Sequence, residues 1–145
     1  MIRRRLVPVL AVATAALGTS FALPAHAAVT AFSTVMTGSQ EVPGPGDANA
    51  IGSAIVTLDS STGQVCVRWH LRNVGTITAG HIHAAPAGVA GPVVVPLPTP
   101  VGDFSSGCTT ASPALVQRII DNPSNYYVNV HDAEFPGGVM RGQLP

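Results

Sequence analysis

The sequence predicts an all-β protein, an antiparallel β-sandwich with one short helix near residues 113–121. Two observations favour this fold class. Short stretches rich in β-branched residues, with alternating apolar and polar positions, recur along the chain between turn-forming segments rich in proline and glycine. Only one segment carries the capping signals of a helix, and the chain shows no internal repeat and no heptad pattern.

Alternation and β-branched content predict the first three strands at residues 29–36, 54–58 and 65–71. Asp59-Ser-Ser-Thr-Gly63 separates the last two with turn-forming residues, which predicts a hairpin. Further strands are expected at 76–83, 92–97, 126–131 and 139–144. The turn-forming segment Phe135-Pro-Gly-Gly138 joins the final pair.

The segment from Ser112 to Pro123 is predicted to be the helix. Ser112 is a good N-cap residue, Pro113 occupies the first helical position, and Pro123 ends the segment. Leu115, Ile119 and either Val116 or Ile120 would form its apolar side.

The N-terminal residues have the pattern of a secretory signal peptide. Three arginines at 3–5 precede an apolar run at 6–23, and Ala25-His26-Ala27 fits the site after which a signal peptidase cleaves. We therefore expect a signal peptide at 1–27, a single exported domain at 28–145 and no membrane span after cleavage. The alternative is a retained N-terminal anchor.

The charge excludes one class of partner, and the cysteine content predicts a disulfide. From Ala28 onward, four arginines against seven acidic residues give a net charge of −3, and the chain has no lysine. Nucleic acid is therefore not an expected partner, because its binding needs clustered cations. In an oxidising compartment, Cys66 and Cys108 are expected to form a disulfide; the alternative is two buried free thiols.

Three histidines form the candidate functional site. His81 and His83 are two residues apart, so both should emerge on one face of a strand, with Ile82 turned into the core. His131 shares a strand face with Tyr127 and Asn129 by the same rule. Two imidazoles from one strand and a third from a neighbour would suit copper or zinc.

Other interpretations of the histidines and of their neighbours remain possible. Asp132 could ligate the metal or orient a histidine ring as a hydrogen-bond acceptor. The imidazoles could instead hydrogen-bond loop carbonyls and hold the loop after His83 in place. His70, flanked by Arg68 and Arg72, is interpreted as a surface histidine.

Signals for other chemistries are missing from the sequence. It contains no G-x-S-x-G nucleophile motif and no glycine-rich phosphate loop after a strand. Glu41 and Glu134 flank proline- and glycine-rich turns and are expected to be solvated, so no acid/base pair is predicted.

Three blocks of sequence, in order, resemble the CHRD (chordin) domain family. They are Gly38-Ser-Gln-Glu-Val-Pro43; Ala79-Gly-His-Ile-His83 with Pro86-Ala-Gly88 and Gly91-Pro-Val-Val94; and Tyr127-Val-Asn-Val-His131 with Pro136-Gly-Gly138 and Arg141-Gly-Gln-Leu144. The resemblance implies a small, exported, bacterial-type β-sandwich protein. The cysteine-rich modules that accompany the domain in chordin are missing from this chain, so growth-factor binding is not carried over. Val139-Met140 stands where the family usually has Glu-Ile, which removes one carboxylate.

A fainter resemblance is to copper-zinc superoxide dismutases, through the His81/His83 strand, the segment Val128-Asn-Val-His-Asp132 and Arg141. The zinc loop of those enzymes is missing here. The sandwich is accordingly expected to be immunoglobulin-like or dismutase-like.

The leading hypothesis is a secreted, non-enzymatic binding or structural module with copper or zinc at His81, His83 and His131. The alternatives are a copper-dependent dismutase-like enzyme and a metal-free adhesion or scaffold protein that binds an extracellular partner.

Overall fold

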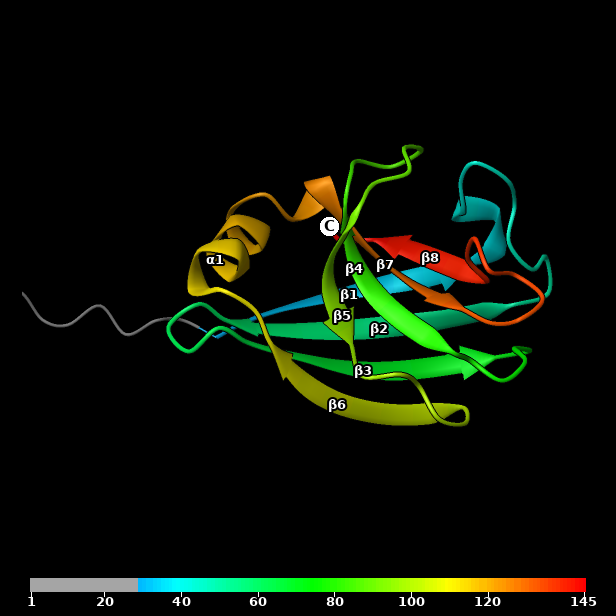
Figure 1. Cartoon of the computed structure of the whole chain (residues 1–145), viewed down its shortest axis with the longest axis horizontal. Helices are drawn as coiled ribbons and strands as arrows, with labels where there is room; N and C mark the ends of the chain where they lie inside the picture. Colours follow the sequence, from blue (N-terminus) through cyan, green and yellow to red (C-terminus); the bar gives the residue numbers. More distant parts are fainter. Residues whose placement is uncertain (1–28) are drawn as a thin grey trace, which may run out of the picture.

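The computed structural model describes residues 29–145, and the predicted signal peptide at 1–27 lies outside the described residues. Within residues 29–145, the fold consists of eight strands and one α-helix (Figure 1). The strands are β1 (Thr30–Thr37), β2 (Ile51–Asp59), β3 (Gln64–Arg72), β4 (Ala79–Ala84), β5 (Val93–Leu97), β6 (Phe104–Thr110), β7 (Tyr126–His131) and β8 (Met140–Gln143). The helix α1 spans Pro113–Asp121, and the short 3-10 helices η1 and η2 span Gly38–Gln40 and Pro123–Asn125.

The strands form where the sequence alternates, because a half-buried strand turns every second side chain into the core. In β3, Val65, Val67 and Trp69 are buried while Arg68 is exposed. The predicted β2–β3 hairpin is confirmed. Gly63 closes its turn with φ +75° and donates its N–H to the Asp59 carbonyl at 2.9 Å.

The strands follow the order β5-β4-β7-β8-β1-β2-β3-β6 in one antiparallel sheet. Between β1 and β8 the backbone pairing is limited to Thr37 and Arg141. The sheet bends at this junction, so the β5-β4-β7-β8 half lies across the β1-β2-β3-β6 half, with β5 approaching β3 and β6 (Figure 1). This two-layered, all-β arrangement confirms the predicted fold class.

The core lies between the two half-sheets. Its members are aliphatic and aromatic side chains from both halves and from the helix, including Met36, Val56, Leu71, Ile82, Val95, Ile119, Val130 and Met140. Ile82 is fully buried, which confirms that the side chain between the two histidines of β4 points inward. The opposite face of β4 is therefore free to carry polar groups.

The predicted helix is confirmed as α1. The Ser112 hydroxyl oxygen accepts the backbone N–H of Leu115 at 3.3 Å, and Val116 and Ile119 are buried against the sheet. Ile120 is only partly buried, so Val116 is the residue that completes the apolar side. Within residues 29–145, no helix has the length and apolar character needed to cross a membrane.

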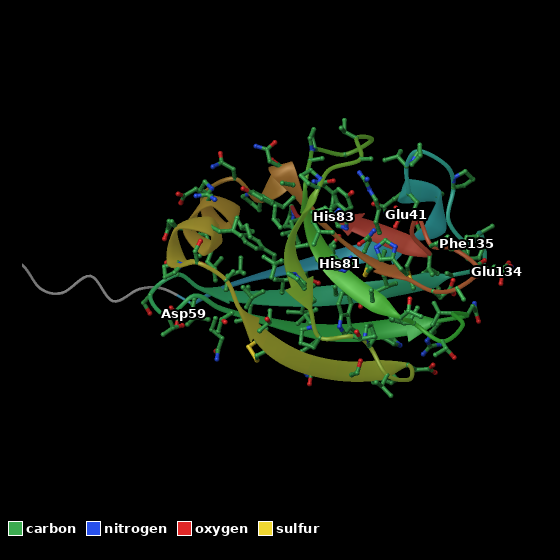
Figure 2. All side chains as sticks on the ribbon, viewed as in Figure 1. Glu41, Asp59, His81, His83, Glu134 and Phe135 are labelled. Carbon is green, nitrogen blue, oxygen red and sulfur yellow. A yellow bond between two sulfur atoms is a disulfide. The ribbon has the colours of Figure 1, made fainter. Side chains whose placement is uncertain are left out.

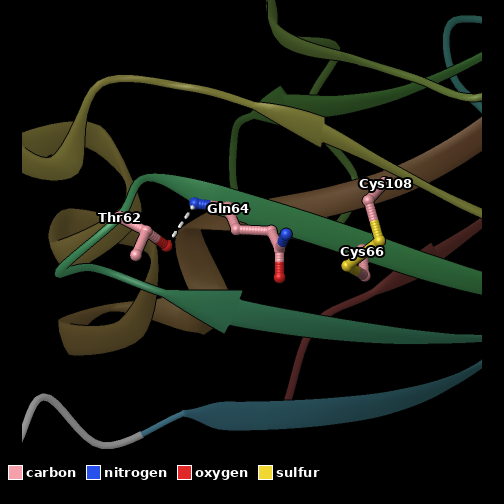
Figure 3. Close-up of a disulfide and its surroundings, with 4 residues drawn as sticks. All are labelled: Thr62, Gln64, Cys66 and Cys108. Atoms are coloured by element: carbon pink, nitrogen blue, oxygen red, sulfur yellow. Dashed lines mark hydrogen bonds between the residues drawn. A yellow bond between two sulfur atoms is a disulfide. The ribbon is translucent and has the colours of Figure 1, made fainter.

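One strand, β6, was not predicted. Its sequence, FSSGCTT, has little apolar alternation, and it forms an edge that pairs only with β3. Cys66 and Cys108 face each other directly across this pair and form the predicted disulfide (Figure 3). The strand β6 buries little apolar surface, and the disulfide attaches it covalently to β3.

Candidate metal centre

The three predicted histidines lie on one face of the β4–β7 pair. His81 and His83 come from β4, and His131 ends β7. The antiparallel register places Ala79 opposite His131, His81 opposite Asn129 and His83 opposite Tyr127. Because residues directly opposite each other share a face, all three imidazoles emerge on the side away from Ile82.

The histidine cluster, defined as His81, His83 and His131, brings its ring nitrogens close together. One nitrogen from each ring lies within 4.8 Å of those of the other two. The ring centroid of His81 lies 5.5 Å from that of His83 and 5.1 Å from that of His131. Figure 2 labels His81 and His83 on the same strand, β4.

Hydrogen bonds to backbone carbonyls orient two of the rings, those of His83 and His131. His83 Nδ1 donates to the Gly91 carbonyl at 2.8 Å, and His131 Nδ1 donates to the Pro136 carbonyl at 3.1 Å. In the neutral rings, the lone pairs therefore reside on Nε2. Among residues 29–145, His83 Nε2 and His81 Nδ1 are buried and have no hydrogen-bond partner.

Asn129 is the remaining polar neighbour of the cluster. Its Oδ1 lies 3.1 Å from His131 Nε2. The amide oxygen can only accept, so in a neutral ring with its proton on Nδ1 this contact to Nε2 is not a hydrogen bond. A metal at Nε2 would replace that contact.

The environment of His81 and of His131 favours the neutral imidazole. Burial lowers the pKa of His81, and the neighbouring His131 and His83 lower it further. Burial also lowers the pKa of His131, while its hydrogen bond to Pro136 opposes this effect. Because the neutral ring is the form that binds metals, both residues are prepared as ligands at neutral pH.

The arrangement fits a cation with three protein ligands. Zinc–nitrogen bonds of about 2.0–2.1 Å place tetrahedral ligand nitrogens about 3.3 Å apart, so small ring movements would close the cluster around an ion. The Gly91 and Pro136 carbonyls act on His83 and His131 as the outer acceptors that orient metal-binding histidines elsewhere. His81 and His131 are only partly buried, which leaves a side open for a fourth ligand.

Asp132, the possible further ligand or acceptor, and His70, interpreted as a surface histidine, both lie outside the cluster. Asp132 is buried, but its Oδ1 accepts the backbone N–H groups of Glu134 and Phe135, and the Pro136 carbonyl is the group that receives the His131 ring proton. His70 lies on the outer face of β3, where it stacks on Phe104 at 4.2 Å and accepts a hydrogen bond from Arg72.

The expectation that Glu41 is solvated is wrong, although Glu134 is exposed as expected. Glu41 is only 6% exposed, and its Oε1 has no hydrogen-bond partner within residues 29–145. It fills the space beside Gly138, where an added Cβ would lie 2.4 Å from the carboxyl carbon. The proline- and glycine-rich flanks suggested exposure, but the β7–β8 turn folds over this carboxyl group.

Burial raises the pKa of Glu41 to about 7, against smaller lowering effects of Arg141 and of the Asn129 side chain. Asn129 thus lies between a buried carboxyl group and a histidine of the cluster. The sequence carried no signal for this link, because Glu41 and Asn129 meet only in the folded chain.

Arg141 is the other group that sequence reasoning placed differently. The dismutase resemblance counted it beside the histidines, and a dismutase needs a cation that attracts the substrate anion. In the structure it is 1% exposed and donates to the carbonyls of Val89 and Pro86. Its guanidinium group therefore does not face solvent.

Comparison with known proteins gives one result. The family model described as the CHRD domain matches residues 32–144. The curated proteins and the solved structures that were compared contain no match to this chain. The matched region includes the helix, the whole histidine cluster and all eight strands, except the first two residues of β1. The chain therefore belongs to the CHRD domain family.

Proposed function

We propose that this chain is an exported CHRD-domain protein that binds copper or zinc through His81, His83 and His131. One observation carries the proposal. One ring nitrogen from each of the three imidazoles lies within 4.8 Å of the others, and two of the three rings have a buried nitrogen with no hydrogen-bond partner among residues 29–145. Leaving buried polar atoms without partners costs free energy of about 1–3 kcal/mol each, which a bound cation would recover.

The chemistry of the donor set supports these two metals. Three neutral nitrogens without a carboxylate suit copper and zinc rather than calcium or magnesium, which prefer oxygen ligands. Simple affinity order favours Cu²⁺ over Zn²⁺ at such a site. Export is supported by the disulfide, because disulfides persist mainly in oxidising compartments.

Metal titration with matched variants tests the proposal. The variant His81→Ala removes a ligand whose Nδ1 makes no hydrogen bond within residues 29–145, so little structure should be lost with it. His70→Ala is the control, since it removes a histidine on the opposite half-sheet. We expect the unmodified protein and H70A to bind one equivalent of Cu²⁺ or Zn²⁺, and H81A to bind at least tenfold more weakly.

Equal binding by the unmodified protein and an H81A/H83A double variant would overturn the metal site. In that case the histidines serve to hold the connection between β4 and β5, here called the 84–92 loop because it starts at the last residue of β4. The metal-free scaffold role would then be the better proposal for the domain.

A further inference from the structure

A buried arginine lies behind the histidine cluster. Arg141, in β8, is 1% exposed, and its guanidinium carbon lies 3.9 Å from the centre of the Tyr127 ring. Burying a guanidinium group is costly unless its N–H groups are bonded and its charge is stabilised. The position of Arg141 therefore requires an explanation beyond packing.

Arg141 is the first member of a stack that ends on a proposed metal ligand. The Tyr127 ring lies between Arg141 and His83, and the Tyr127 and His83 rings are 4.8 Å apart with an angle of 8° between their planes. The planar guanidinium group stacks on an aromatic face in a way that a lysine ammonium group cannot reproduce. One face of the His83 ring is thus fixed through Tyr127.

The same arginine also holds the loop that fixes the edge of the His83 ring. Arg141 Nη1 donates to the Val89 carbonyl at 3.1 Å, and Nη2 donates to the Pro86 carbonyl at 3.5 Å. Further along this loop, the Gly91 carbonyl accepts the His83 Nδ1 proton, and the Gly91 N–H donates to the Tyr127 hydroxyl.

Gly91 has no room for a side chain, because an added Cβ would lie 2.2 Å from the Ala84 carbonyl oxygen. The carbonyl that receives the His83 proton is therefore set by tight backbone packing as well as by the arginine.

We propose that Arg141 is a positioning residue for the metal site, holding His83 in the orientation and tautomer that leave Nε2 free. The inference rests on the proposed metal function and adds the residue that prepares one of its ligands. Arg141 acts through Tyr127 on the ring face and through the 84–92 loop on the ring edge. Arg141 is not one of the proposed ligands, and its buried guanidinium group does not face solvent.

The test follows the His83 ring in the metal-free protein and then measures metal affinity. Proton–nitrogen NMR distinguishes Nδ1–H from Nε2–H in each histidine ring. The first variant, Arg141→Lys, keeps the positive charge but loses the planar stacking group and the forked N–H donors. The second, Arg141→Met, loses the charge, the stacking group and the donors. Arg68→Met, an exposed position on the outer face of β3, is the control.

In the unmodified protein and in R68M, we expect His83 to carry its proton on Nδ1. In R141K and R141M, we expect a mixture of tautomers and a Cu²⁺ or Zn²⁺ affinity 10- to 100-fold weaker. If R141M does not fold, R141K decides. A His83 ring that stays Nδ1-protonated in both folded variants, with affinity within twofold of R68M, would overturn the inference.

Failure of the metal function is distinguishable from failure of this inference. If the unmodified protein binds neither metal, the proposed function is lost. The tautomer of His83 in the metal-free variants then still decides whether Arg141 positions the ring.

Discussion

The buried carboxyl group of Glu41 couples the stability of this protein to pH. The pKa of Glu41 is about 7 in the folded protein, above its ordinary value of 4.5. Between these two pH values the folded state binds more protons than the unfolded chain, so stability falls as pH rises. The contribution of the neutral Glu41 is complete below pH 4.5 and is lost as the pH passes 7.

The variant Glu41→Gln, which is neutral at every pH, should remove this dependence. From pH 5 to pH 8 we expect the free energy of unfolding of the unmodified protein to fall by about 2 kcal/mol relative to E41Q. Urea denaturation of both proteins at the two pH values, with chelator present, measures the difference. Glu134→Gln, at an exposed position, is the control. Parallel pH profiles for the unmodified protein and E41Q would show that Glu41 does not bind the extra proton.

Residue-level sequence reasoning succeeded where geometry is local. The alternation of a strand predicted that His81 and His83 share a face and that Ile82 is buried, because neighbouring side chains on a strand point to opposite sides. It failed for Glu41 because burial there depends on a turn almost a hundred residues further along the chain.

At the level of elements, the edge strand β6 is the one strand that hydrophobic alternation did not predict. Its serine, glycine and threonine residues carry little hydrophobic signal, and its inner and outer positions are alternately half-buried and exposed. The pairing with β3 and the disulfide between Cys66 and Cys108 compensate for this weak burial. The cysteine count predicted the bond, but nothing local predicted the strand.

Removing the disulfide should therefore destabilise the protein markedly. The bond closes a loop with a sequence separation of 42, for which the chain-entropy model gives about 3–4 kcal/mol. We expect the double variant Cys66→Ala/Cys108→Ala to unfold at correspondingly lower urea concentration. A reducing agent should destabilise the unmodified protein and leave the double variant unchanged. A loss below about 1 kcal/mol would mean that β3–β6 pairing alone suffices.

At the scale of the whole molecule, the fold separates core from site. The inner faces of the two half-sheets form the core, and the outer face of the β4–β7–β8 region carries the histidine cluster, Tyr127, Asn129 and Arg141. The 84–92 loop is hydrogen-bonded to this face through Arg141, Gln143 and His83. Metal binding would thus join two strands and the loop that covers them.

Metal should consequently stabilise the entire fold. A ligand present at 100 times its Kd adds about 2.7 kcal/mol to the free energy of unfolding. For a domain of this size, we expect Cu²⁺ or Zn²⁺ to raise the Tm by about 10 °C. Thermal unfolding with metal, and again after addition of chelator, measures the shift. The shift should vanish in H81A and persist in H70A; a shift of equal size in H81A would assign it to binding elsewhere.

The sequence by itself determined the all-β class, seven of the eight strands, the capped helix and the disulfide partners. It also determined which face of β4 carries His81 and His83. These features follow from local periodicity, turn chemistry and a single available cysteine pairing. Tertiary structure alone decided that the β4–β7 register brings His131 to the pair. It also decided which carbonyls receive the ring protons, and that Glu41 and Arg141 are buried beside the site. These contacts join segments far apart in the chain, and their geometry depends on strand register and loop packing that no local pattern encodes.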